Sequence, residues 1–284
     1  MIPAAFDYAR PASLDEALKS LSGGGKAIAG GQSLLPLLKL RLARTDRLVD
    51  IGRLAELRGI TRDADGGLAI GALTTYRELL DSPGAMVYAC LAEAVPGIGD
   101  VQVRNRGTVG GAISHADPAS DLPAVLLALD ATIVARSVGG ERRIAATEFF
   151  QGAFQTALAD GELVTRVTLP PASQSPGSAY RKLEQPASGY SIVGVAAVLG
   201  WQGSTVSVAR IGVTGVGGVA YRARAVESAL IGSDGSAAAI SAAAARATDG
   251  QTVASDIHAD AEYRGRMAQI YVRRAVEAAL AVLA

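Results

Sequence analysis

Residues 108–123 (TVGGAISHADPASDLP) constrain the fold of this chain more than any other stretch. They combine a Gly-Gly pair with a histidine, two aspartates and two prolines, a composition that interrupts regular structure and favours turns and helix caps. An almost wholly apolar run follows at residues 124–129, so the polar stretch is attached to something buried. The composition predicts an irregular loop set against the protein core, and a poor helix or strand.

Residues 29–34 (AGGQSL) have the same character, with a Gly-Gly pair, polar side chains and then an apolar run. Glycine lets backbone approach a ligand closely, and successive N–H groups in such loops bind anions, diphosphates in particular. Two loops, 29–33 and 108–112, therefore predict one elongated, phosphate-bearing ligand held at two places, with Ser33 and Thr108 as hydroxyl donors. The alternative is that each loop is only a tight turn with its caps.

Polar side chains in the second stretch are further candidates. Asp117 and Asp121 suit the hydroxyl groups of a ribose or ribityl chain, although Asp121 could instead cap the helix expected at 124–129. His115 is a candidate general base or covalent attachment point, and a structural histidine is the alternative. Because the chain shows no Ser/His/Asp set and no paired carboxylates, its chemistry is expected to come from a cofactor.

The composition excludes several classes of protein. A single cysteine, Cys90, rules out an internal disulfide framework and a thiolate-ligated zinc or iron–sulfur site on this chain, and two histidines rule out a multi-histidine metal site. Lys plus Arg and Asp plus Glu both number 27, which argues against a dedicated nucleic-acid binder. No apolar run reaches about 18 residues and the N-terminus lacks a signal-peptide core, so we expect a cytoplasmic protein without a membrane span.

Residues 1–169 mix short strands with helices, which indicates an α+β or α/β architecture. Capping boxes at Ser13/Glu16 and Thr75/Glu78 predict two helix starts. Further helices are expected at 34–42 (short, interrupted near Pro36), 85–95, 124–129 and 147–158, and strands at 26–29, 48–51, 68–72, 132–135 and 162–169.

Residues 170–178 (PPASQSPGS) read as a linker, and the character of the sequence changes after it. Strand-like runs at 179–184, 191–201 and 205–216 precede helical runs at 224–230, 237–247 and 262–283, which indicates a small antiparallel sheet backed by helices. The expected division is a first domain at 1–172 (subdomains about 1–57 and 58–172), a linker at 173–178 and a second domain at 179–284.

Several motifs together resemble one known family, the FAD-binding medium subunits of molybdenum hydroxylases, which include carbon monoxide dehydrogenase and the flavin domain of xanthine dehydrogenase. The resemblance covers nearly the whole chain and rests on AGGQSLLPLLKLR (29–41), QVRNRGTVGGAISHADPASDLP (102–123), EFFQGAFQTAL (148–158), PASGYSIVGVAAVL (186–199) and YRGRMAQIYVRRA (263–275).

The resemblance implies a two-subdomain FAD-binding domain of the vanillyl-alcohol-oxidase (PCMH) type, followed by a domain of three antiparallel strands and a helical bundle. It implies that both glycine segments contact the FAD diphosphate, that Ile98 contacts the flavin, and that Tyr190 covers one face of the isoalloxazine ring. The implied residues for non-covalent FAD binding are Ala29, Gly30, Gly31, Gln32, Ser33, Leu34, Ile98, Thr108, Val109, Gly110, Gly111, Ala112, Ser114, Asp117, Asp121 and Tyr190. Gln32 and Ala112 depart from the histidine and asparagine that other members carry.

By this resemblance, the chain is an electron-transfer subunit of a heterotrimeric molybdenum hydroxylase. Molybdopterin belongs to a large subunit and iron–sulfur clusters to a small one, two trimers pair as a dimer, and the acceptor places the assembly in the cytoplasm or at the inner face of the membrane. Two other readings are a self-sufficient flavin dehydrogenase or oxidase of the same fold, which would need its own substrate pocket, and a non-catalytic binding module.

Overall fold

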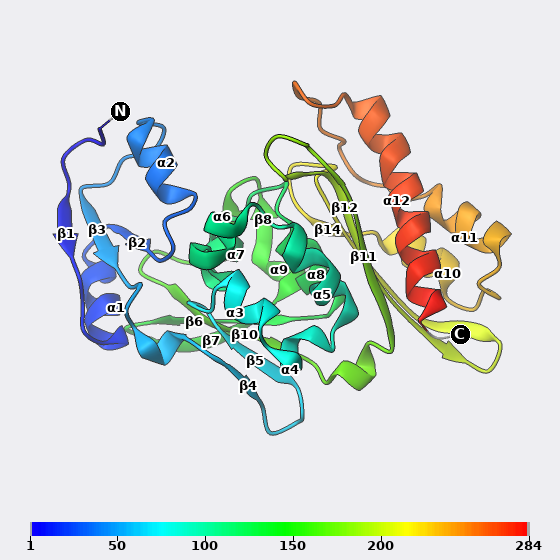
Figure 1. The fold of residues 1–284 in the computed structure, drawn as a ribbon, viewed down its shortest axis with the longest axis horizontal. Coiled ribbons are helices and arrows are strands. Elements are labelled where there is room, and N and C mark those ends of the chain that lie inside the picture. The colour runs from blue at the N-terminus through cyan, green and yellow to red at the C-terminus, as the bar shows by residue number, and fades with distance from the viewer. Residues whose placement is uncertain (1, 283–284) are drawn as a thin grey trace.

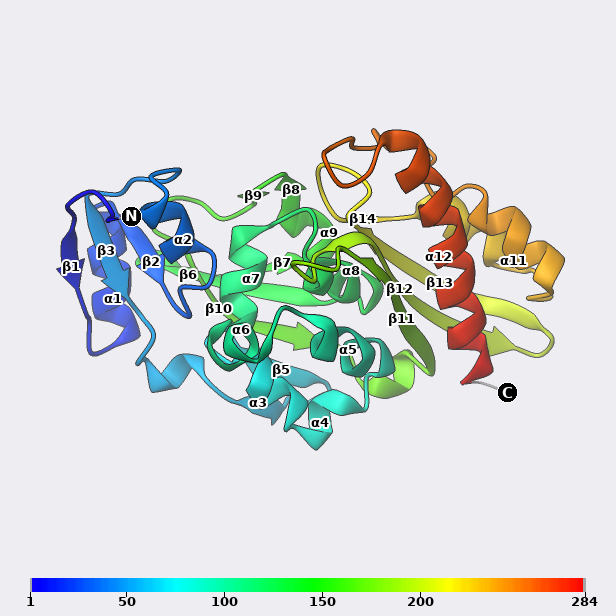
Figure 2. The ribbon, with the colours of Figure 1, turned by 45° about the horizontal axis from the view of Figure 1, so that its top comes forward.

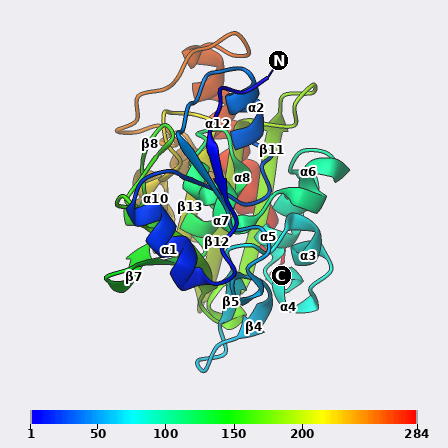
Figure 3. The ribbon, with the colours of Figure 1, turned by 90° about the vertical axis from the view of Figure 1, so that its left-hand side faces the viewer.

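The computed structural model describes residues 2–282 and shows an elongated molecule in which three groups of elements follow one another along the long axis (Figure 1). Residues 7–50 form a small parallel sheet in the order β1-β3-β2, with helices α1 and α2 between its strands. The bounds are β1 (Asp7–Ala9), α1 (Leu14–Ser22), β2 (Lys26–Ile28), α2 (Leu34–Lys39) and β3 (Arg47–Asp50). Figure 3 looks along the long axis with these elements nearest the viewer.

The N-terminal group forms where local sequence predicts it. Ser13 caps α1 by accepting the Glu16 N–H, while the Glu16 carboxylate accepts the Ala12 N–H (2.8 Å). The buried face of α1 carries Leu14, Ala17, Leu18 and Leu21 at helical spacing, and it packs on the parallel sheet in a core of its own. Residues 29–33 are the connection from the end of β2 to the start of α2.

The middle group is an antiparallel sheet in the order β4-β5-β10-β6-β7, covered on one face by short helices (Figure 2). Its strands are β4 (Ile60–Arg62), β5 (Leu68–Gly71), β6 (Thr132–Ser137), β7 (Gly140–Ala145) and β10 (Leu163–Leu169), and a separate pair is β8 (Phe150–Gly152) with β9 (Gln155–Thr156). Its α-helices are α3 (Tyr76–Leu80), α4 (Pro83–Met86), α5 (Ala89–Ala94), α6 (Val101–Arg106), α7 (Val109–His115), α8 (Asp121–Ala128) and α9 (Ala146–Phe149), and its 3-10 turns are η1 (Ala55–Leu57), η2 (Val95–Gly97) and η3 (Ala172–Gln174).

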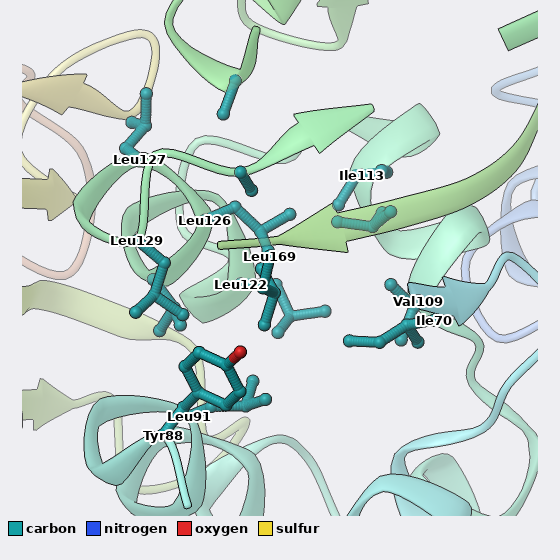
Figure 4. Packing of buried hydrophobic residues seen from close by; sticks show 14 of the residues in the cluster. Ile70, Tyr88, Leu91, Val109, Ile113, Leu122, Leu126, Leu127, Leu129 and Leu169 are labelled. Carbon is teal, nitrogen blue, oxygen red and sulfur yellow. The ribbon is translucent and has the colours of Figure 1, made fainter. Parts of the chain in front are cut away.

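The middle core lies between the sheet and these helices (Figure 4). Figure 4 shows Ile113 of α7, Leu122 and Leu126 of α8 and Leu169 of β10 pointing toward one another, with Tyr88 and Leu91 below them. All of these side chains are nearly inaccessible to solvent. α8 is buried along its whole length, because strands β12 and β13 of the C-terminal sheet and helices α5, α7 and α9 of the middle group all pack against it.

The C-terminal group is an antiparallel sheet in the order β11-β12-β13-β14 with α12 on its outer face, as expected of a sheet backed by helices. Its elements are β11 (Gly177–Glu184), β12 (Ser191–Gln202), β13 (Thr205–Thr214), β14 (Tyr221–Arg222), α10 (Arg224–Leu230), α11 (Ala237–Ala244) and α12 (Ala261–Ala281). The predicted helix 262–283 ends at Leu283, which lies outside the described residues. The short β14, which the sequence did not indicate, extends the sheet beyond the three predicted strands.

The strand β12 serves two cores. Ala196 and Val198 belong to the middle core, whereas Val195, Ala197 and Leu199 pack with α12 in a second core. This alternation follows from the two-residue period of a strand, and it explains why β12 is apolar on both faces. The C-terminal sheet is therefore continuous with the middle group instead of being attached through the 170–178 segment alone.

Candidate functional site

The structure brings the first glycine segment against the residues that lead into the second. Gly30, in the loop after β2, lies against the backbone at the end of α6: a Cβ built on Gly30 would be 1.9 Å from the Arg106 carbonyl oxygen and 3.2 Å from Gly107 Cα. Only a residue without a side chain fits at such a distance. Thr108, the N-cap of α7, follows directly, so the start of the second glycine segment is next in the chain to the residues that Gly30 contacts.

The loop at residues 29–33 presents unpaired donors. Within residues 2–282, no protein acceptor receives a hydrogen bond from the N–H groups of residues 30–34, although Leu35 N–H donates to Gly31 O (3.1 Å) and Leu37 N–H to Ser33 O (3.3 Å). Gly31 has a φ of +75°, in the left-handed region that glycine adopts readily. A run of unpaired N–H groups in a half-exposed turn is a concave site for an anion.

Residues 108–112 do not form the expected loop: they are the N-cap and first turn of helix α7. The N-terminal donors of this helix are satisfied inside the protein, because Val109 N–H donates to Thr74 O (2.9 Å), Gly110 N–H to Ala72 O (2.8 Å) and Gly111 N–H to the Thr108 hydroxyl (3.2 Å). The prediction that these groups form a second anion-binding loop is therefore wrong as to conformation.

The two glycines of α7 have different surroundings. A Cβ on Gly110 would be 2.5 Å from Ala72 Cβ, so this glycine allows α7 to pack closely on the end of β5. Gly111 is exposed, and Ser114, three residues later, is exposed on the same side of the helix. Gly111 and Ser114 are thus the solvent-facing residues of α7, while Val109 and Ile113 belong to the core.

Asp121 does not cap α8, because Ser120 occupies the N-cap position and Asp121 is the first residue of the helix. Its carboxylate is 4% exposed and accepts hydrogen bonds from the hydroxyl groups of Tyr180 and Ser191 (2.7 Å for Ser191) and from Lys182 Nζ (3.0 Å). Burial raises the pKa of Asp121, and the Lys182 ammonium and the two hydroxyl groups oppose that shift. Its side chain is therefore a buried anchor between α8 and the C-terminal sheet.

Ile98 and Tyr190 lie in neighbouring turns. Lys182 Nζ also donates to Gly97 O (2.9 Å), and Gly189, in the turn between β11 and β12, would place a Cβ 3.7 Å from Gly99 N. Tyr190 is 45% exposed, and partial burial, followed by the charges of Asp117 and Asp121, raises its pKa. The turns that carry Ile98 and Tyr190 thus lie against each other near the polar anchor.

Arg104 supports the same turn. Its Nη1 donates to the carbonyl oxygens of Ile98 (3.0 Å) and Gly99 (2.7 Å), so it is more than a solvated loop charge. Arg106, the last residue of α6, is exposed. Residues 101–106 form helix α6, capped by Asp100, whose side chain accepts the Val103 N–H (2.7 Å).

His115 is the last residue of α7, packed beside the Phe154 ring at a centroid distance of 5.0 Å and 4.0 Å from the Asp117 carboxylate. Burial lowers its pKa, and Asp117 partly offsets this. Asp117 in turn accepts the Ala119 N–H (2.9 Å) and so orders the turn before α8.

Cys90 is fully buried in the middle core, which raises the pKa of its thiol to about 12, as expected of a structural cysteine.

Lys182, Tyr180 and Ser191 were not predicted from the sequence. A signal was present, since Tyr180 and Lys182 are two residues apart in a predicted strand and must face the same side of it. Nothing in the sequence identified the buried carboxylate that they meet.

Over the described part of the chain, no three His, Cys, Asp or Glu side chains are grouped so as to hold a metal ion. No helix in residues 2–282 has the length and apolar character needed to cross a membrane.

Comparison with known proteins agrees with this geometry. Residues 4–172 match the family described as the FAD binding domain in molybdopterin dehydrogenase, and residues 178–279 match the CO dehydrogenase flavoprotein C-terminal domain. The medium chain of carbon monoxide dehydrogenase from Hydrogenophaga pseudoflava is 40% identical over 285 residues, covering 99% of both chains. Subunit alpha of the 6-hydroxypseudooxynicotine dehydrogenase complex of Paenarthrobacter nicotinovorans is 41% identical over 99% of this chain and 96% of its own.

A solved structure is equally similar. The carbon monoxide dehydrogenase of Hydrogenophaga pseudoflava lacking the Mo-pyranopterin moiety of its cofactor superposes with a TM-score of 0.95 at 40% identity, covering 99% of each chain. Agreement over both domains, in sequence and in backbone, leaves the whole chain within one family. The chain belongs to the FAD-binding medium subunits of the molybdenum hydroxylases, the family that includes the carbon monoxide dehydrogenase medium chains.

Proposed function

We propose that this chain is the FAD-carrying electron-transfer subunit of a heterotrimeric molybdenum hydroxylase. It would accept electrons from iron–sulfur clusters of a small subunit and pass them to an external acceptor, with molybdopterin on a large subunit. The single observation that carries the proposal is the run of unpaired N–H groups at residues 30–34, whose first residue, Gly30, lies against the backbone at the end of α6. This is the donor set that a diphosphate requires.

The chain's own residues would divide the work of holding FAD, which when bound supplies the redox chemistry. The N–H groups of residues 30–34 would bind the diphosphate, with the Ser33 hydroxyl, Gly111 and Ser114 completing the surface around it. Tyr190 and Ile98 would contact the flavin ring, since an aromatic face stacks well on another planar ring. Asp117 and Asp121 would order the turn between α7 and α8, next to the flavin contacts.

The proposal keeps every FAD-binding residue predicted from the sequence, but it assigns different roles to two residues of α7. Val109 and Gly110 would act through packing, because their N–H groups are engaged by the protein. Direct contact of Asp121 with FAD stays a prediction, since its carboxylate already accepts three side-chain hydrogen bonds. The remaining proposed binding residues are Ala29, Gly30, Gly31, Gln32, Leu34, Thr108 and Ala112.

We also propose domain limits at 1–172 and 179–284, with 173–178 as the connection and a subdomain boundary near residue 57. The location in the cytoplasm and the pairing of two heterotrimers are likewise proposals that rest on the family resemblance. In this scheme the substrate is determined by another chain.

The experiment is to purify the chain and analyse it for flavin. Purified protein should be yellow, and heat or acid should release FAD in a ratio approaching one per chain. A colourless protein that does not take up added FAD would contradict the proposal. The chain alone should turn over no organic substrate, and robust turnover by the isolated chain would favour the self-sufficient flavin oxidase. FAD binding without any electron transfer to or from partner subunits would favour the non-catalytic module.

A further inference from the structure

The buried arginine of the C-terminal helix has no part in the binding set described above. Arg264, in the first turn of α12, is 4% exposed. Its Nη1 donates to the carbonyl oxygens of Ile192 (2.8 Å) and Gly215 (2.6 Å), its Nη2 to the Asp256 carboxylate (2.6 Å) and its Nε to Ala259 O (3.4 Å). One guanidinium therefore joins the start of β12, the end of β13 and the loop before α12.

A charge at this place is costly to bury, so its use requires an explanation. The other buried residues of α12 are alanine and valine. An apolar side chain at position 264 would avoid the free-energy cost of removing a guanidinium from water. That cost often exceeds the Coulombic attraction gained in a buried ion pair. What an apolar residue could not do is fix two backbone carbonyl groups in a planar, directional arrangement.

The first of these carbonyl groups belongs to the strand that holds the turn before α8. Ile192 follows Ser191, whose N–H donates to Ala119 O (3.1 Å) and whose hydroxyl donates to Asp121 (2.7 Å). Tyr190, the proposed flavin contact, precedes Ser191 directly. Fixing the Ile192 carbonyl thus fixes the residue that links Tyr190 to Asp121.

The second carbonyl group belongs to the strand on the other side of the same turn. Gly215 N–H donates to Pro118 O (2.8 Å), and the Thr214 hydroxyl donates to the carbonyl oxygens of Pro118 (2.7 Å) and Ser120 (2.9 Å). Gly215 has a φ of +81°, and a Cβ there would be 2.6 Å from the carbonyl oxygens of both Ser191 and Ile192. The two strand ends are therefore held within close contact around the guanidinium.

We propose that Arg264 is a positioning residue for the flavin site. By holding the Ile192 and Gly215 carbonyl groups, it sets the strand ends that hold residues 117–121 and the Tyr190 turn. The inference rests on the proposed function for its relevance to FAD. Its structural half, the coupling of Arg264 to residues 118–121, concerns the protein alone and can be tested separately.

The test compares the full chain with its Arg264→Met, Arg264→Lys and Arg266→Met variants. Arg266 is the matched control, because it lies on the same helix but its side chain is 72% exposed, and among residues 2–282 it forms an ion pair only with Glu262. Two measurements are made: amide hydrogen exchange at Ser191 and Gly215 in FAD-free protein, and the Kd for FAD by titration.

Arg264→Met should raise exchange at the Ser191 and Gly215 amides about tenfold or more and weaken FAD binding by a similar factor, since hydrogen bonds from a charged donor are lost. For Arg264→Lys, both the exchange rates and the Kd for FAD should lie between those of wild type and Arg264→Met, because an ammonium group has three donors but lacks the planar arrangement of a guanidinium. Arg266→Met should change neither measurement. Exchange in the β6–β10 pairing should stay at the wild-type level in all variants.

Unchanged exchange and unchanged Kd in Arg264→Met would overturn the inference. If Arg264→Met does not fold, Arg264→Lys decides: wild-type exchange at both amides and a wild-type Kd would then overturn it. Loss of protection spread evenly over the β6–β10 pairing would also overturn it, by showing a general role in stability. A wild-type chain that binds no FAD would contradict the proposed function, whereas the exchange data would still decide the coupling to residues 118–121.

Discussion

Replacing Gly30 by alanine is the sharpest test of the contact between the two glycine segments. The added Cβ would lie 1.9 Å from the Arg106 carbonyl oxygen, whereas ordinary contact begins at 3.4 Å, so the loop and the end of α6 must separate by about 1.5 Å. Both partners are backbone, and no side chain can rotate to relieve the overlap. Overpacking of this kind costs roughly 1–3 kcal/mol.

The consequence for FAD is expected to exceed the consequence for folding. Residues 30–34 lie in a half-exposed loop that can move outward, which relieves part of the strain in the FAD-free protein. A displacement of this size would misalign one or two N–H groups that the diphosphate needs, and each charge-assisted hydrogen bond is worth about 1.5–3 kcal/mol. FAD binding should therefore weaken by roughly ten- to a hundredfold or more.

The assay is titration of FAD-free protein, followed by flavin fluorescence, with urea unfolding to measure stability separately. Gly218→Ala is the matched control, because a Cβ at Gly218 meets nothing within 4 Å and its φ is not positive. A Gly30→Ala protein with an unchanged Kd for FAD would refute the reasoning, since it would mean that the contact between the segments does not shape the binding surface.

Other predictions concern the supporting structure. Gly212→Ala should lower the free energy of unfolding by about 1–3 kcal/mol or more in urea, because its Cβ would lie 2.0 Å from the Ala124 carbonyl oxygen. Asp121→Asn should lower it by roughly 3–5 kcal/mol, since a buried ammonium loses its counter-charge; a stability equal to wild type would show that Lys182 finds another partner. His115→Gln should flatten the pH dependence of stability: burial lowers the folded-state pKa, so the unfolded chain binds more protons and wild type should lose stability as pH falls below about 6.5. Identical urea midpoints for wild type and His115→Gln across pH 5–7 would contradict this.

Features fixed by neighbouring residues were predictable. The Thr75/Glu78 capping box forms as expected, with the Glu78 carboxylate accepting the Thr75 N–H (2.6 Å), and the period-two pattern of the C-terminal strands is observed. Such signals depend on side chains within one turn or one strand, so no knowledge of the fold is needed to read them.

Two predicted helices failed because tertiary contacts overrode a helical pattern. Residues 147–158 form only the short α9 before the β8–β9 hairpin, where Phe149 is fully buried and Phe154 adopts a φ of +57°. The predicted helix at 85–95 is broken into α4 and α5 near Tyr88, whose hydroxyl donates to Pro170 O (2.6 Å). Tyr88, and Phe154 through its ring contact with His115, thus have partners outside their own segments, which periodicity cannot reveal.

The glycine-rich stretch was misread for a different reason. Glycine, serine and aspartate are common both in loops and at helix ends, so the composition of residues 108–123 could not distinguish a loop from two short helices joined by a turn. The outcome depended on Thr74 and Ala72, whose carbonyl groups accept the first N–H groups of α7. The unpaired N–H groups therefore lie in the other glycine segment, and contact of residues 108–112 with the diphosphate stays a prediction.

The same limit explains why the site's support was invisible from the sequence. Asp121 is separated by about sixty to seventy residues from the side chains that hold it, and those side chains lie beyond the segment that reads as a linker. A linker implies independent domains, yet β12 contributes to the middle core and its first residue holds Asp121. The turn that carries Tyr190 is therefore ordered by both domains at once. Under the proposed function, the Tyr190 contact with the flavin lies at the interface between the middle and C-terminal groups. We therefore expect substitutions in the C-terminal sheet to change FAD binding even where they leave both glycine segments intact.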